Sequence, residues 1–148
     1  MGHTNQKLKL AEFTIISEVQ QTKAALKELY DFLIDFKNFR SILPEDKVEN
    51  FEYTSDSCSF NIKGITALSI KVISKTPYTS VKFQSEGLAK FNFILEAKFA
   101  GAPQSTGQCS IELFGDMNPF IKTMAEKPLI TLVNTMAMKL AQLEVGKE

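Results

Sequence analysis

Residues that commonly act as nucleophiles, general bases or metal ligands are few in this sequence. The one histidine, His3, lies in a polar leader outside the predicted elements, so no catalytic dyad, triad or histidine metal site can be built from it. Cys58 and Cys109 fit neither a zinc-binding spacing nor a disulfide framework. Because a reactive thiolate needs a positive and accessible setting, we interpret both as buried, inert thiols. We predict no catalytic residue, no metal and no cofactor.

The carboxylates also lack the arrangement that acid–base catalysis needs. Glu86, Glu96 and Glu112 fall on strand positions predicted to point to solvent, and no two acids share the inward-facing positions. The other acids that we considered are expected at helix ends or turns, where a capping or solvated carboxylate is the usual explanation: Asp31, Asp35, Glu45, Asp46, Glu49, Asp56 and Asp116. The glycines form no phosphate-binding loop, so nucleotide binding by a known motif is not predicted.

A few polar side chains remain that could contact a ligand. Tyr30, Tyr53 and Tyr78 are expected near the ends of elements, where their hydroxyl groups could orient a ligand head group, and Ser85 is expected to face inward. Each of these groups could equally be satisfied by backbone atoms or water.

Composition is that of a soluble globular domain. The 148 residues are 44% hydrophobic and 23% charged, and such a chain can bury about two thirds of its unfolded surface. Seventeen basic residues balance seventeen acidic ones without a basic cluster, so nucleic acid is not an expected partner. No stretch has the roughly 18 apolar residues of a membrane helix, and the start lacks a signal-peptide pattern. We therefore expect a cytoplasmic protein with no integral membrane association, and composition favours no particular oligomeric state.

The first third of the chain predicts a strand followed by two short helices, after a disordered leader at 1–7 whose start resembles a cloning remnant. Alternation predicts a strand over 10–19. Thr22 is expected to cap a helix, with an apolar face of Ala25, Leu26, Leu29, Tyr30 and Leu33. Asp35 is expected to cap a second helix, which buries Phe36, Phe39 and Leu43 before Pro44 ends it.

Residues 48–117 change to a period of two and predict six strands. Turn signals at residues 55–57, 64, 75–77, 87 and 101–103 separate them, and such short connections favour an antiparallel meander. Alternate positions within the strands from Cys58 to Leu113 are almost all apolar, and most positions between them are polar or charged. A sheet with one dry face must be covered by another element.

The last predicted helix, over 118–145, is the one element long enough to cover that face. Asn118 and Pro119 form a helix-start signal. Apolar residues then recur at helical spacing and form one stripe: Ile121, Ala125, Leu129, Leu132, Met136, Leu140 and Leu143. Pro128, which has no N–H to donate, is expected to interrupt or bend this helix.

This order of elements resembles the START and birch-pollen-allergen-like (SRPBCC) superfamily, which has the helix-grip fold. The resemblance covers residues 10–143 and rests on the element order, on the segment 30–39 leading to Leu43-Pro44, and on Asn118-Pro119 at the start of the last helix. It implies an α+β fold in which a curved seven-stranded antiparallel sheet wraps around the C-terminal helix, and a single domain over 8–145. It also implies a cavity for a hydrophobic ligand between sheet and helix.

We therefore predict binding, transport or sequestration of a hydrophobic or amphipathic small molecule or lipid, without catalysis. Sheet and helix would supply the walls of the cavity: Phe60, Ile62, Leu68, Ile70, Phe83, Ser85, Phe91, Phe93, Leu95, Ile111, Leu113, Leu129, Leu132 and Met136. A solid, close-packed core is the alternative for the same residues. Two other functions found among such proteins stay open, namely a polyketide cyclase or dehydratase and a protein-interaction module of co-chaperone or quinone-associated type.

Overall fold

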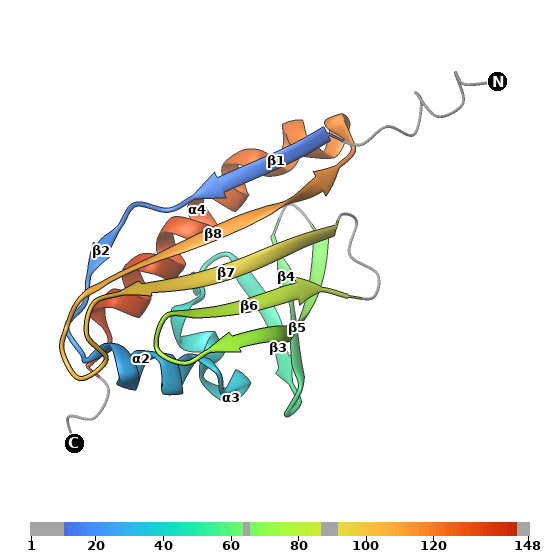
Figure 1. The fold of residues 1–148 in the computed structure, drawn as a ribbon. Coiled ribbons are helices and arrows are strands. Elements are labelled where there is room, and N and C mark those ends of the chain that lie inside the picture. Colours follow the sequence, from blue (N-terminus) through green and yellow to red (C-terminus); the bar gives the residue numbers. More distant parts are fainter. Residues whose placement is uncertain (1–10, 64–65, 87–91, 145–148) are drawn as a thin grey trace.

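A computed structural model describes residues 11–63, 66–86 and 92–144, and the predicted leader at 1–7 lies outside them. Figure 1 shows one curved sheet with a long helix along its inner face and two short helices at one end. In chain order the elements are β1 (Ala11–Ile16), β2 (Gln20–Gln21), α2 (Leu26–Leu33), α3 (Phe36–Phe39), η1 (Arg40–Ile42), β3 (Val48–Tyr53), β4 (Ser57–Ile62), β5 (Thr66–Thr76), β6 (Ser80–Ser85), β7 (Asn92–Ala100), β8 (Gln108–Met117) and α4 (Pro119–Gln142).

The sheet is the predicted antiparallel meander, closed at one side by the first strand. Its strand order is β1-β8-β7-β6-β5-β4-β3, and β2 also pairs with β8. The strand predicted over 10–19 ends at Ile16, and Gln20–Gln21, beyond the predicted range, form a separate short strand on β8. The described residues therefore form a sheet of eight strands rather than the seven expected. All neighbours are antiparallel, with register shifts in β3 and between Val72 and Ser74.

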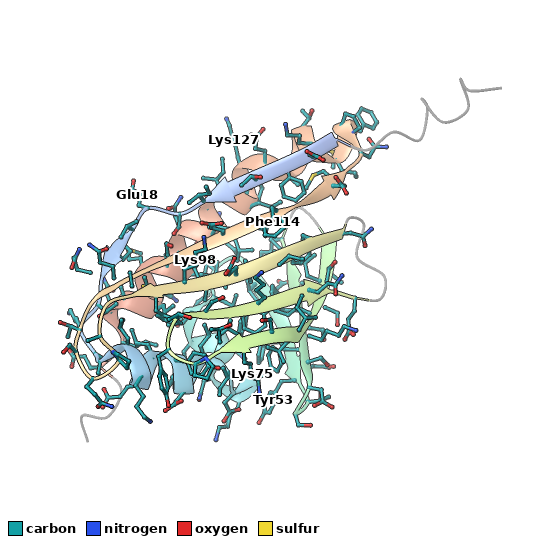
Figure 2. All side chains as sticks on the ribbon, viewed as in Figure 1. Glu18, Tyr53, Lys75, Lys98, Phe114 and Lys127 are labelled. Carbon is teal, nitrogen blue, oxygen red and sulfur yellow. The ribbon has the colours of Figure 1, made fainter. Side chains whose placement is uncertain are left out.

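The two faces of the sheet differ as predicted. Phe60, Phe83 and Leu95 on the inner face are at most 4% exposed, and the alternate positions face solvent. Figure 2 shows Lys98 and Phe114 on the outer face, where the Lys98 ammonium pairs with the Glu112 carboxylate at 3.0 Å. The inner face must therefore be covered, and the helices do this.

The helix α4 begins as its sequence predicts and runs through its internal proline. The Asn118 side chain accepts a hydrogen bond from the Phe120 N–H at 2.7 Å, and Pro119 occupies the first turn. The helix is continuous over its 24 residues, so the interruption expected at Pro128 is not observed. The predicted stripe is buried from Ala125 to Leu140, and Ile121 and Leu143 at its two ends are partly buried.

The start of α2 differs from its prediction. Ala25, not Thr22, occupies the N-cap, and no side chain caps the helix. The loop between β7 and β8 supplies the acceptors instead: the N–H groups of Leu26 and Lys27 donate to backbone carbonyls of that loop at 3.0 and 2.8 Å. Thr22 accepts from the Gly107 N–H and donates to the Ala24 carbonyl, so its hydroxyl joins the start of the helix to the loop just before β8. The predicted cap at Asp35 is confirmed by a 3.0 Å hydrogen bond from the Lys37 N–H.

A buried serine holds β8 where the first strand leaves the ladder. Ser17 is 4% exposed; its Oγ accepts from the Ile111 N–H at 2.9 Å and donates to the Glu18 carbonyl at 2.9 Å. Both partners are backbone groups, which are costly to bury unpaired. None of the helices among residues 11–63, 66–86 and 92–144 is long and apolar enough to cross a membrane.

We predict that Ser17→Ala lowers the free energy of unfolding by about 1–3 kcal/mol, because the Ile111 N–H loses its acceptor inside the protein. Urea unfolding followed by circular dichroism measures this change. The control is Ser41→Ala, at an exposed residue of η1, for which we expect a change within about 0.5 kcal/mol. Equal effects of the two substitutions would contradict the prediction.

Candidate functional site

The residues predicted to line a ligand cavity do converge on the interior of the sheet and on α4. Twelve of them are at most 4% exposed: Phe60, Ile62, Leu68, Ile70, Phe83, Phe93, Leu95, Ile111, Leu113, Leu129, Leu132 and Met136. Ser85 is half-buried and its Oγ accepts from the Phe93 N–H at 3.0 Å, so part of its hydrogen-bonding capacity is already used. Phe91 lies outside the described residues.

Much of the predicted aromatic wall is covered by α3 rather than facing open space. The Phe83 ring lies 5.3 Å from the Phe39 ring and 5.7 Å from the Phe36 ring, centre to centre. The Phe60 ring lies 6.5 Å from the Phe39 ring. The spacing of Phe36 and Phe39 predicted a buried helix face, but the surface that this face meets depends on the tertiary structure. This part of the interior is therefore packed core.

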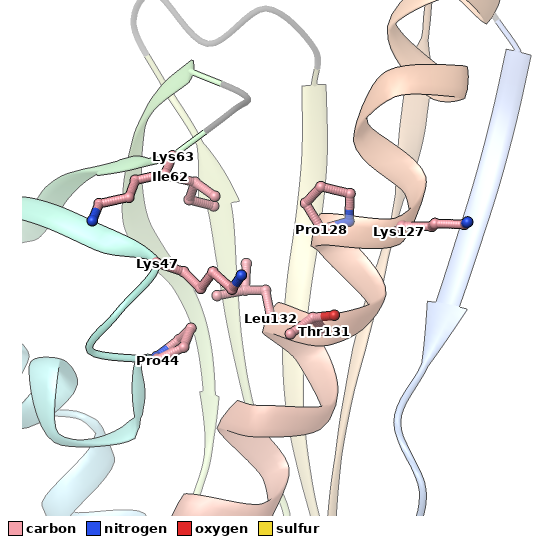
Figure 3. Close-up of a pocket in the computed structure, with 8 residues that line it drawn as sticks. All are labelled: Pro44, Lys47, Ile62, Lys63, Lys127, Pro128, Thr131 and Leu132. Atoms are coloured by element: carbon pink, nitrogen blue, oxygen red, sulfur yellow. The ribbon is translucent and has the colours of Figure 1, made fainter.

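A pocket of 240 Å³ opens between α4 and the start of β3 and end of β4 (Figure 3). Ile62 and Leu132 are the two predicted cavity residues that line it, and both are almost fully buried. The remaining lining residues were not predicted as site residues: Pro44, Lys47, Lys63, Lys127, Pro128 and Thr131. Little in the sequence indicated that these residues line a pocket, because they lie in a turn, at the end of a strand and on the part of the last helix outside its predicted apolar stripe.

The pocket lies where α4 separates from the sheet. The helix packs mainly against β8, β1 and η1, whereas β3 and β4 form the opposite edge of the sheet and contact it little. The turn at 44–47 is held by a hydrogen bond from the Lys47 N–H to the Pro44 carbonyl at 3.2 Å. Opposite it, Pro128 presents its ring to the pocket (Figure 3) and leaves the carbonyl four residues before it without the usual helical partner. The hydrogen-bonded turn at 44–47 and the turn of α4 that contains Pro128 thus form the two sides of the opening.

The base of the pocket is apolar and its rim carries positive charge. Ile62, Leu132 and the two prolines supply the apolar surface, and three lysines and Thr131 supply the polar groups. A more open groove of 460 Å³ adjoins it, shares Pro44, Lys47 and Thr131, and adds Glu45, Asp46, Thr135 and Lys139. This arrangement suits an amphipathic ligand whose apolar part lies at the base of the pocket and whose polar part lies at the rim.

The three tyrosines do not contribute to this pocket. Tyr30 is buried and meets the Tyr78 ring edge-on at 5.4 Å, and the Lys27 ammonium lies 5.6 Å from the centre of the Tyr78 ring. Burial, with the nearby Asp31 carboxylate, raises the pKa of the Tyr30 hydroxyl. Tyr53, on β3, is 52% exposed and packs against Phe51. Tyr30 and Lys27, both on α2, thus pack against Tyr78, and Tyr53 is not part of this cluster.

The two cysteines are buried thiols, as predicted. Cys58 and Cys109 are each 2% exposed and unpaired, and Cys109 Sγ lies 3.7 Å from the Ala137 carbonyl oxygen. Burial raises the pKa of both thiols to about 12. Among residues 11–63, 66–86 and 92–144 no group of three or more histidine, cysteine, aspartate or glutamate side chains could hold a metal ion.

We predict that the folded protein reacts slowly with Ellman's reagent at pH 8 and that both thiols react rapidly in urea. The unfolded chain releases the thiol protons above a pH of about 8.5, whereas the folded chain retains them up to about 12. The thiol contribution to stability is thus complete below about pH 8.5 and falls as pH rises toward 12. Urea unfolding at pH 7 and 9.5 measures the fall, which Cys58→Ala with Cys109→Ala should reduce. Rapid thiol reaction in the folded protein would contradict this prediction.

Comparisons of the sequence find no match to a family model and none to a curated protein. Comparisons of the structure do find matches. Norcoclaurine synthase from Thalictrum flavum, in complex with dopamine and hydroxybenzaldehyde, has a TM-score of 0.66 at 11% identity, over 91% of this chain and 87% of the synthase. A protein of unknown function from Staphylococcus aureus has a TM-score of 0.62 at 7% identity, over 90% of this chain and 96% of that protein.

A third match is a protein of unknown function from Bacillus thuringiensis, with a TM-score of 0.58 at 7% identity, over 88% of this chain and 98% of that one. The TM-scores establish a shared architecture. At such low sequence identities they give no information about a shared activity. The chain therefore shares with these structures the α+β helix-grip fold that the order of its elements predicted.

Proposed function

We propose that this chain binds a hydrophobic or amphipathic small molecule, without transforming it, in the pocket between α4 and the β3–β4 edge. The observation that carries the proposal is the position of Ile62 and Leu132 at the base of this pocket. Both side chains belong to the core, being 4% and 3% exposed, and they form the inner end of an opening that reaches the surface. Apolar surface at the base of a concave site is what small-molecule binding commonly uses.

The size of the pocket restricts the ligand. Its 240 Å³ is slightly below the roughly 300–1,000 Å³ of typical ligand sites. A guest with one or two rings or a medium-length chain fits this space better than a two-chain lipid. The fold supports the same class, since norcoclaurine synthase is described in complex with two small aromatic molecules, dopamine and hydroxybenzaldehyde.

Binding without catalysis is favoured by the groups at the site. The lining side chains are aliphatic, lysine and threonine, and none is an acid or a histidine. Glu45 and Asp46 border the adjoining groove rather than the apolar base. An acid–base mechanism needs a donor and an acceptor within hydrogen-bond reach of the reacting atoms. Lysines at the rim can hold and orient a guest, which is a binding role.

We predict that the neutral fluorescent dye N-phenyl-1-naphthylamine binds the wild-type protein and that Leu132→Ala binds it more tightly. Removing the Leu132 side chain opens the base of the pocket toward the interior. Burying about 50 Å² more of the dye would lower its dissociation constant by about tenfold, at about 25 cal/mol per Å². Fluorescence titration measures the dissociation constant, and urea unfolding measures stability.

The matched control is Leu140→Ala, on the same helix and equally buried but outside the pocket. Both variants should lose about 2–5 kcal/mol of stability, as truncated core leucines do. Only Leu132→Ala should change dye affinity. If the wild type takes up no dye and both variants differ from it in stability alone, the interior is a filled core and the proposed binding function is wrong.

A further inference from the structure

We propose that the ligand of this pocket is an organic acid, an apolar body with a single carboxylate that pairs with the Lys47 ammonium. The inference rests on the proposed binding function and specifies its ligand class. Figure 3 shows the Lys47 side chain reaching across the mouth of the pocket toward Leu132 and Thr131. Its charged end thus lies at the boundary between the apolar base and solvent, where a carboxylate attached to a buried apolar body would lie.

The backbone of Lys47 is fixed, so its side chain starts from a defined point. Its N–H donates to the Pro44 carbonyl at 3.2 Å, and its carbonyl accepts from the Lys63 N–H at 2.9 Å. These two bonds close the turn at 44–47 and join it to the end of β4. A side chain on a held backbone loses less entropy when it pairs with a ligand than one on a mobile loop.

Lys47 differs from the other lysines around the pocket. The Lys63 ammonium has a carboxylate partner, Glu49, at 3.7 Å. The Lys139 ammonium donates to the Leu43 carbonyl at 2.9 Å. Lys127 and Lys63 both extend away from the opening in Figure 3. Lys47 has no ion pair among residues 11–63, 66–86 and 92–144, and it is the lysine that points across the opening.

The surrounding charges favour a monoanion over a dianion such as a phosphate. Thr131 also lines the pocket, on the facing side of α4, and adds no charge to it. Glu45 and Asp46 precede Lys47 and line the adjoining groove, where they would repel additional negative charge. The lining includes no arginine, the side chain whose planar fork best matches the oxygens of a phosphate. One ammonium at the mouth matches one carboxylate.

The test uses the full chain with N-phenyl-1-naphthylamine as a neutral reporter, displaced by octanoate, 1-octanol or octylamine at pH 7.5. The three competitors share one apolar chain and differ in charge. Octanoate should displace the dye at a concentration about three- to tenfold lower than octanol, as expected for one charge-assisted hydrogen bond at a partly exposed site. Octylamine should be the weakest competitor.

Substitution of Lys47 should remove the preference for the acid. In Lys47→Met, octanoate should compete no better than octanol when each inhibition constant is corrected for the dissociation constant that the dye has with that variant. Lys47→Arg should retain the preference. The control for overall charge is Lys71→Met, at an exposed residue of β5 remote from the pocket, which should behave like the wild type.

The outcomes separate this inference from the proposed function. If the dye binds and octanoate and octanol compete equally in the wild type, the carboxylate assignment is wrong and binding of a neutral ligand stands. If Lys47→Met keeps the preference for octanoate, or if Lys63→Met removes it, the pairing of the carboxylate with Lys47 is wrong. If neither the dye nor octanoate binds the wild type, by fluorescence and by calorimetry, both the proposed function and this inference are wrong.

Discussion

The dry face of the sheet is the constraint on which the rest of this structure depends. Alternate residues along six strands present phenylalanine, leucine and isoleucine to one side, and leaving that surface in water would cost far more than the net stability of a domain. One long helix along β1 and β8 and two short ones at the end of the sheet together cover it. The caps, the hydroxyl bridges to β8 and the turn at 44–47 hold these covering elements in place.

One helix covers the curved sheet unevenly, and the pocket lies where the coverage is weakest. The helix packs against β8 and β1, whereas β3 and β4, at the opposite edge of the sheet, contact it little. The phenylalanines of α3 fill the gap at one point, against Phe83 and Phe60. Nearer the other end the gap stays open beside Pro128, where proline also removes a helical hydrogen bond. Packed core and open site therefore lie side by side under one helix.

Positive charge at the mouth of an apolar pocket gives the site its chemical character. An ammonium at such a boundary stays solvated when the pocket is empty, so it costs little, and it can pair with a guest without being buried. The buried thiols and Tyr30 lie elsewhere in the interior, where burial raises their pKa values and favours their neutral forms. The buried thiols and Tyr30 thus act as neutral packing groups, and the charged group that can pair with a ligand is the lysine at the rim of the pocket.

The sequence by itself determined the elements and the inner residues, because periods of 2 and 3.6 state directly which side of a strand or helix is buried. It predicted the meander, the caps at Asp35 and Asn118 and the buried stripe of α4, all of which the structure confirms. Only the tertiary structure decided where that interior is filled and where it is open. It also placed Lys47 opposite Thr131, since these residues are far apart in the chain and meet only when α4 crosses the sheet. A local pattern records burial, but an opening between two elements depends on the distance between them.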